Sequence, residues 1–288
     1  MRKDNSLLQQ KLSKPLKLPA LAKNIHVLMQ SLADENMDYR QLAEVIRHYP
    51  DITARIIFLV NSPWSAPISP VNNIEQACSR LGVPIVKSIS IALSIASSFD
   101  TKKCPLFSTV YFWTTSMLVV EGATMLASKL PNHISSLEFK QTAQTAGILH
   151  NLGLLWLADN FPIETDKALQ MIIDEPYSLS VSDSLKQCTG TDYCEVGGWI
   201  AKQLGFPEVL VTPIEYHLNP DYQESSWEIA LLIGSAARMV SALHKQADEI
   251  STDSRLELLG LNPATQKLIY QKLSMNFEKN LELAKILF

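Results

Sequence analysis

Apolar residues recur at intervals of three and four along most of the chain, and one such stretch encloses a polar pair. In residues 141–161 the apolar positions are Ile148, Leu149, Leu152, Leu155 and Trp156. This spacing predicts one or two buried helices. His150 and Asn151 lie in the middle of the stretch, between Gly147 and Gly153. Because a buried imidazole and a buried amide both need hydrogen-bond partners, the pattern predicts a polar pocket around the pair.

The same helical spacing continues between capping signals and prolines. The predicted caps are Asp38 with Gln41, Asp51, Asn73, Ser135 with Glu138, Ser225 with Glu228, and Asn262 with Pro263. No segment alternates with period two for long enough to predict a strand, so we expect an all-α fold. A connector at Cys104-Pro105 suggests three parts, which are an N-terminal lobe over residues 1–104, a second lobe over 105–250 and a C-terminal appendage over 251–288.

Composition excludes several classes of partner. The 288 residues are 47% hydrophobic and 19% charged, with a net charge of -4. This balance argues against a nucleic-acid partner, which would favour a basic surface. The apolar runs fall short of the roughly 20 residues of a membrane span, and the N-terminus does not resemble a signal peptide. We therefore expect a cytoplasmic protein with no membrane partner. The four cysteines show no C-x-x-C spacing and are expected to be free thiols.

Several short motifs, in a consistent order, resemble the HDOD family, the HD-related output domain of bacterial signalling proteins. They are Leu18-Pro19, Tyr49 to Arg55, Val60 to Pro63, Ile74 to Ala77, and Leu81-Gly82. The resemblance covers approximately residues 15 to 245. It implies an HD-like helical bundle lobe joined to an N-terminal helical lobe, and a role in protein interaction. The implied partners are signalling proteins such as cyclic-dinucleotide or two-component regulators.

The His150-Asn151 pair resembles the His-Asp signature of the HD phosphohydrolase superfamily, which binds a catalytic metal. Thr115 stands where that superfamily has its first metal-binding histidine, Ala237 stands at its final aspartate, and His217 is the other histidine close to the pattern. We call the set the vestigial pocket: Thr115, His150, Asn151, His217 and Ala237. A divalent metal requires anionic oxygens, and Asn151 offers only a neutral carbonyl. We therefore expect no catalytic residue and no metal cofactor, and we interpret His150 and His217 as core histidines rather than ligands.

A second set of residues belongs to the N-terminal lobe. Asp51, Arg55, Asn61 and Ser62 surround one predicted helix, and Trp64 opens the loop that follows. The structural interpretation makes them helix caps, a helix stop and an ion pair. The alternative is a partner surface, to which the exposed Trp64 loop is suited.

Two functions remain open from the sequence. The first is a non-enzymatic signalling module, and the alternative is a metal-dependent phosphohydrolase acting on a nucleotide or another phosphoester. The missing carboxylates favour the first. No Walker loop, G-x-G-x-x-G fingerprint or G-x-S-x-G elbow points to any other chemistry.

Overall fold

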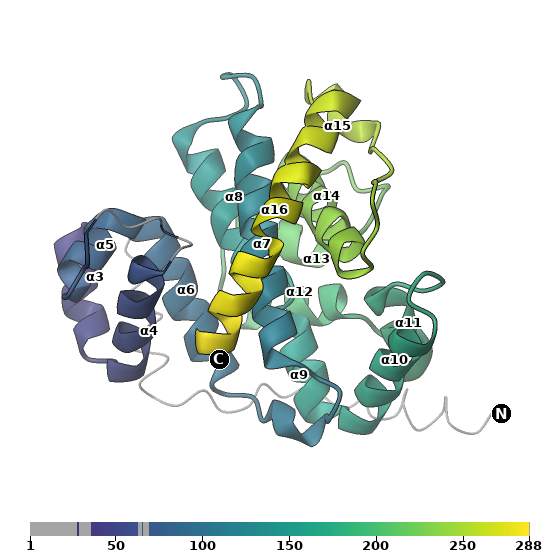
Figure 1. The fold of residues 1–288 in the computed structure, drawn as a ribbon, viewed down its shortest axis with the longest axis horizontal. Coiled ribbons are helices and arrows are strands. Elements are labelled where there is room, and N and C mark those ends of the chain that lie inside the picture. The colour runs from purple at the N-terminus through teal and green to yellow at the C-terminus, as the bar shows by residue number, and fades with distance from the viewer. Residues whose placement is uncertain (1–27, 29–35, 63–64, 66–68, 288) are drawn as a thin grey trace.

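The structure is a computed structural model that describes residues 28, 36–62, 65 and 69–287. Within these residues it contains helices and no strand, which confirms the predicted fold class (Figure 1). The helices are α3 (Tyr39–Arg47), α4 (Pro50–Asn61), α5 (Ile74–Leu81), α6 (Val83–Ala96), the 3-10 helix η2 (Thr101–Lys103), α7 (Thr109–Ser128), α8 (Leu137–Leu149), α9 (Leu152–Asn160), α10 (Pro162–Asp174), α11 (Val181–Thr189), α12 (Tyr193–Gln203), α13 (Glu208–Tyr216), α14 (Trp227–His244), α15 (Arg255–Leu258) and α16 (Pro263–Leu287).

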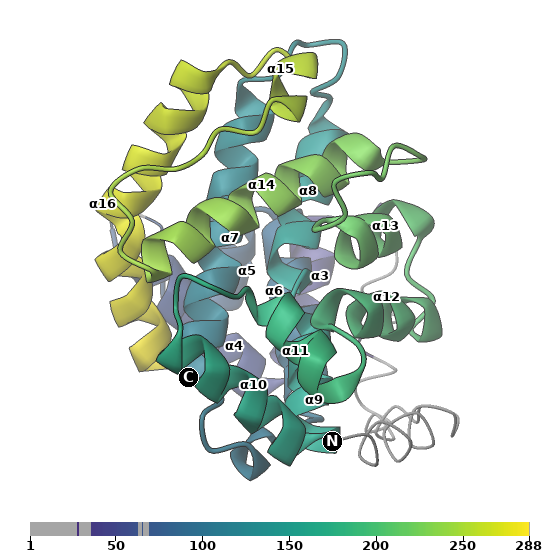
Figure 2. The same cartoon turned by 90° about the vertical axis from the view of Figure 1, so that its right-hand side faces the viewer.

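Helix α7 is the central element, and α8, α14 and α16 pack against it. Figure 1 shows α3, α4 and α5 gathered at one end of the molecule, with α6 between them and the remaining helices. In Figure 2, α14 crosses α7, while α9, α10 and α11 form the opposite end of the bundle from α15. This arrangement places the ends of α8, α12 and α13 beside one another.

The hydrophobic core is continuous across the predicted lobe boundary at residue 104. One cluster joins Ile56 of α4 and Val86 of α6 to Trp113 of α7 and Leu155 of α9. A second cluster joins the later half of α7 to α14, α15 and α16. The C-terminal helix buries residues in both clusters, so the last part of the chain contributes to the core; the boundaries at 104 and 250 stay predictions.

Three of the predicted caps are confirmed. Asp38 Oδ1 accepts hydrogen bonds from the N–H groups of Arg40 and Gln41, and the Gln41 side chain accepts from the Asp38 N–H, which completes a capping box. Asn73 accepts from the Gln76 N–H, and Asn262 accepts from the Thr265 N–H. These caps depend only on residues within one turn, which is why the sequence predicts them.

Three other cap predictions are wrong. Asp51 lies inside α4, because Pro50 takes the first helical position and Tyr49 is the N-cap. Ser135 instead donates to the Ala127 carbonyl at 2.7 Å, and Ser136 caps α8 through the Phe139 N–H. The N-cap residue of α14 is Ser226, which has a left-handed backbone (φ 60°) and makes no capping hydrogen bond with its side chain. The predicted cap, Ser225, therefore lies one residue before the N-cap position.

The close contact of α8 with α7 at Gly147 gives a first prediction. A Cβ atom built on Gly147 would lie 3.0 Å from the Val120 Cα atom, so a larger side chain must displace backbone. We expect Gly147→Leu to lower the free energy of unfolding by about 1–3 kcal/mol through overpacking. Gly147→Ala, which adds only the Cβ atom, should cost less. Equal thermal stability of the leucine variant and the wild type would contradict this packing.

No single helix in the described part of the chain is long and apolar enough to span a membrane, although α5 and α6 together, bent by 113°, meet the length and composition criterion.

The four cysteines are free thiols, as expected, and three of them are buried.

Candidate functional site

His150 and Asn151 lie at the junction of two helices. His150 ends α8 and Asn151 precedes α9, and the side chains are 1% and 4% exposed. Residues before and after the pair are apolar and fully packed, so both polar side chains are held inside the bundle. The hydrogen-bond partners that burial requires come from α7 and from the two neighbouring turns.

His150 and His217 lie side by side. His217 ends α13 and is 2% exposed, and its ring centroid lies 5.4 Å from that of His150 with an angle of 82° between the ring planes. His150 Nδ1 lies 2.8 Å from the Gly147 carbonyl oxygen, and His217 Nδ1 lies 2.9 Å from that of Pro213. A carbonyl oxygen only accepts, so each ring carries its proton on Nδ1 and its lone pair on Nε2.

Burial keeps both imidazoles neutral. Burial, together with a smaller repulsion from His217 and against the hydrogen bond with the Gly147 carbonyl, lowers the pKa of His150 to about 3. Burial also lowers the pKa of His217 to about 4, although hydrogen bonds to the Ile214 and Pro213 carbonyls and the charge of Asp192 act the other way. At neutral pH both imidazole rings of the pair are therefore uncharged.

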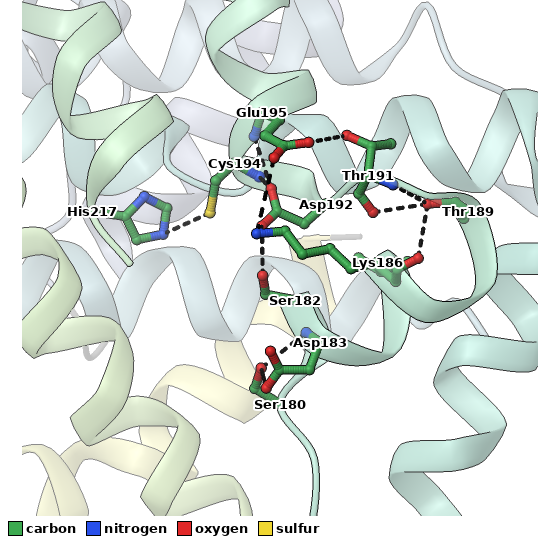
Figure 3. Close-up of polar contacts among 11 residues, drawn as sticks. Ser180, Ser182, Asp183, Lys186, Thr189, Thr191, Asp192, Cys194, Glu195 and His217 are labelled. Atoms are coloured by element: carbon green, nitrogen blue, oxygen red, sulfur yellow. Dashed lines mark hydrogen bonds and ion pairs between the residues drawn. The ribbon is translucent and has the colours of Figure 1, made fainter. Parts of the chain in front are cut away.

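A polar network continues from His217 to the surface (Figure 3). The Cys194 thiol lies 3.7 Å from His217 Nε2, and since that nitrogen holds the lone pair, the thiol donates. Burial raises the pKa of Cys194 well above its usual value, which keeps it a thiol. Asp192, at the N-terminus of α12, accepts from the N–H groups of Cys194 and Glu195 at 2.9 Å each. The site therefore connects two helix ends through one cysteine.

Asp192 is the buried carboxylate of this network, and both of its oxygens already have partners. Ser182 donates to Oδ2 at 2.6 Å and Lys186 Nζ lies 2.9 Å from the same atom. Burial opposes ionisation of Asp192, but hydrogen bonds from Ser182 and the Glu195 N–H, together with Lys186, outweigh it and lower its pKa. The carboxylate is thus ionised and held in place to cap α12.

Asn151 is bound to α7 by both ends of its amide. Ser116 Oγ donates to Asn151 Oδ1 at 3.1 Å, and Asn151 Nδ2 donates to the Phe112 carbonyl at 3.4 Å. Thr115, the residue before Ser116 in α7, instead bonds His244 Nε2 at 2.8 Å. Ala237 is partly buried against the second hydrophobic cluster. The structure therefore brings together His150, Asn151 and His217 and places Thr115 in a different contact.

The donor set does not suit a divalent metal that prefers oxygen ligands. Within the described residues, no group of three or more His, Cys, Asp or Glu side chains is placed to hold a metal ion. Two neutral imidazoles and a thiol face one another, and Asp192, the charged acid of the network, is bound by an ammonium, a hydroxyl and two amides. Neither a Mg²⁺ nor a Mn²⁺ ion finds its carboxylate oxygens here.

The N-terminal set is partly engaged in local structure. Asn61 Oδ1 accepts from the Val71 N–H and Asn61 Nδ2 donates to the Val71 carbonyl, each at 2.7 Å, which fixes the end of the loop. Ser62 Oγ donates to the Leu59 carbonyl. Asp51 is exposed, and burial lowers the pKa of Arg55 while Asp51 opposes this. Trp64 lies outside the described residues, so the proposed partner surface stays a prediction.

Sequence reasoning missed Ser116, Asp192 and Cys194 as members of the site. Asp192 did carry a signal, because an aspartate before an apolar helical run is a typical N-cap. Nothing in the local sequence indicates that Ser116 rather than Thr115 faces Asn151, because that choice depends on how α7 is rotated against α9.

The comparisons with known proteins agree with this fold. The HDOD domain family model matches residues 18–220, which is more than half of the chain. No curated protein matches the chain. A solved structure named for signal transduction, from Marinobacter aquaeolei VT8, has 20% identity and a TM-score of 0.81, and the alignment covers 99% of this chain and 65% of that one. The chain thus spans about two thirds of the length of that relative.

Two further structures match over nearly their whole length. One is named as a phosphohydrolase, from Shewanella amazonensis SB2B, with 24% identity, a TM-score of 0.72 and coverage of 98% of each chain. The other is an HDOD domain protein of unknown function from Geobacter sulfurreducens, with 20% identity, a TM-score of 0.73 and coverage of 98% of this chain and 97% of that one. At these identities the structures establish the shared fold. Together with the match of the family model, they show that this chain belongs to the HDOD domain family.

Proposed function

We propose that the protein is a non-enzymatic signalling module that acts through protein interaction in the bacterial cytoplasm. Its partners would be other signalling proteins, such as cyclic-dinucleotide or two-component regulators, rather than nucleic acid or membrane. Membership of the HDOD family supports a role in signal transduction, and one similar structure is named for it. The chemistry of the vestigial pocket supports the absence of catalysis.

The proposal rests on one observation, which is that the polar groups around the histidine pair are already engaged in hydrogen bonds and an ion pair. Metal-dependent phosphohydrolysis needs carboxylates to offset the charge of its ions and to help position an attacking water. Asn151 is neutral and bound to Ser116 and Phe112, and Asp192 is bound by Ser182 and Lys186. Recruiting either side chain to a metal would break buried hydrogen bonds, at a cost of about 1–3 kcal/mol for each group left unsatisfied.

The alternative is a metal-dependent phosphohydrolase, and one feature favours it. Both imidazoles donate Nδ1–H to a backbone carbonyl, which is the tautomer that metal-bound histidines adopt. A similar structure is also named as a phosphohydrolase. The two proposals differ in a measurable property, which is turnover.

We expect the wild-type protein to release no product when it is assayed with Mn²⁺, Mg²⁺, Fe²⁺ or Ni²⁺ against nucleotides, cyclic dinucleotides and an aryl phosphate. Asn151→Asp should not restore activity, because the new carboxylate would face the Phe112 carbonyl oxygen, which the amide now contacts. The same repulsion should lower the free energy of unfolding by about 1–3 kcal/mol.

The control for stability is Asn160→Asp. Asn160 Nδ2 also donates to a backbone carbonyl, that of Trp156 at 3.0 Å, but the residue is exposed, so water can solvate the acid and the cost should be small. Metal-dependent turnover that is lost in both His150→Ala and His217→Ala would replace the signalling proposal with the hydrolase. Metal analysis of protein purified without chelator or histidine tag gives an independent check.

A further inference from the structure

An aromatic hollow lies away from the histidine pair, between the end of α13, the loop that follows, the start of α14 and α15. Aromatic side chains line it from three positions, Tyr216, Tyr222 and Trp227. Its enclosed volume is only about 10 Å³, so it is a shallow depression on which a partner side chain would lie rather than a pocket that would enclose one. Leu258, also in the lining, is 73% exposed.

The tyrosines of the hollow are held in a defined arrangement. The rings of Tyr216 and Tyr222 stack with centroids 4.4 Å apart and an angle of 8° between their planes. The Tyr222 hydroxyl donates to the Ser225 carbonyl at 3.0 Å, which fixes the loop around it. Tyr and Trp side chains in such positions supply much of the energy of many protein interfaces.

The arginine of the hollow is held by partners within the chain, although its carboxylate partner Asp253 is shared with a second arginine, Arg238. Arg255 Nε and Nη2 donate to the two carboxylate oxygens of Asp253 at 3.0 and 2.7 Å, and Nη1 donates to the Pro220 carbonyl at 2.9 Å. Although burial opposes the ionisation of Asp253, the hydrogen bonds and charges of the arginines lower its pKa. Arg255 is therefore a structural part of the floor.

Acidic residues flank the lining on every segment. Asp221 precedes Tyr222, Glu224 follows Gln223, Glu228 follows Trp227 and Glu257 precedes Leu258. Asp221, Glu224 and Glu257 are exposed, and within the described residues no ion pair joins any of these four acids to a cation. Residues 218–258 contain seven acids and three Lys or Arg residues, a net charge of -4, which equals the net charge of the whole chain.

We infer that this aromatic hollow with its acidic surround, which we call the acidic-aromatic surface, docks a basic segment of a partner protein. An arginine or lysine of the partner would lie against the aromatic faces, where a cation is attracted by the ring quadrupole. The unpaired acids would attract the remaining basic residues and speed the encounter. An apolar side chain of the same segment would cover Leu258. The inference rests on the proposed function, because it names the partner chemistry of that interaction.

The test uses the full chain and labelled short peptides that repeat Arg-Leu-Ser, with Gln-Leu-Ser and Glu-Leu-Ser repeats as matched neutral and acidic probes. Fluorescence anisotropy should show binding of the basic peptide, weakened by added salt, and little binding of the others. Asp221→Asn with Glu224→Gln should weaken binding roughly fivefold, as expected for exposed charge pairs. Tyr222→Leu should weaken it about tenfold or more, as expected for an aromatic residue at the centre of an interface.

The end of α10 provides a matched control. This region also presents an exposed aromatic residue, Tyr177, beside two exposed acids, Asp174 and Glu175. The triple variant Asp174→Asn, Glu175→Gln and Tyr177→Ala should leave peptide binding unchanged. Equal binding of the neutral peptide, or equal weakening by the control, would overturn the inference. Thermal unfolding of each variant separates loss of the surface from loss of the fold.

If the basic peptide does not bind and no metal-dependent turnover is found, the inferred docking surface is wrong but the signalling proposal stands. Metal-dependent turnover would contradict the signalling proposal, whatever the result with the peptide.

Discussion

Acidification from pH 7 to pH 5 should destabilise the folded protein by several kcal/mol, because two buried histidines, His150 and His217, and the half-buried His244 must be neutral in it. Burial is the largest cause in each case and lowers the pKa of His150 to about 3 and those of His217 and His244 to about 4. In the unfolded chain these histidines have a pKa near 6.5, so their full contribution to the free energy of unfolding is present above that pH. The contribution falls as the pH drops towards the pKa values of the folded state. Between pH 6.5 and pH 5 each histidine contributes a loss of roughly 2 kcal/mol.

Urea denaturation across this pH range measures the slope. His244→Phe is the informative variant, because His244 Nδ1 is buried without a hydrogen-bond partner and the ring already lies against Tyr111 and Phe277. It should remove about a third of the pH dependence while keeping the aromatic contact. Asp192 and Asp253 have lowered pKa values, so their contribution is lost only as the pH falls below the ordinary aspartate range. A free energy of unfolding that is constant from pH 7 to pH 5 would show that the histidines are solvated.

Gly234→Ala should prevent stable folding or cost more than about 3 kcal/mol. Helix α14 passes the end of α13 so closely that a Cβ atom built on Gly234 would lie 1.8 Å from the His217 carbonyl oxygen. The alanine Cβ atom would be attached to the backbone of α14 and would meet the backbone carbonyl of His217. The clash could be removed only if the two helices moved apart, which would disturb the His150–His217 pair. Circular dichroism and thermal unfolding measure the result.

Gly205→Ala is the matched substitution for this prediction. Gly205 has a φ of +71° and no atom within 4 Å of the built Cβ, so an alanine there meets strain in the left-handed region and no clash. Its expected cost is about 1–2 kcal/mol. If the Gly234 and Gly205 variants lose the same stability, steric contact with His217 is not the reason for glycine at position 234.

The sequence predicted those features that depend on neighbouring residues. The spacing of apolar residues predicted helices throughout, and the Asp38 and Asn73 caps formed because each side chain reaches an N–H within its own first turn. The burial of His150 and Asn151 followed from the apolar residues on both sides of them. The caps at Ser135 and Ser225 failed because an adjacent serine took over or a left-handed residue intervened, and such one-residue shifts are decided by the loop before the helix.

Only the tertiary structure decided which side chains meet in the site. The approach of His150 to His217, the bond of Cys194 to His217 and the choice of Ser116 over Thr115 as the partner of Asn151 depend on the rotation and crossing of α7, α8, α12 and α13. Those crossings result from many apolar contacts spread over the core and from glycines such as Gly234 that let backbones approach. Periodicity along one helix identifies its buried face, but it does not determine which residue of another helix will lie opposite, because that depends on the packing of all the helices at once.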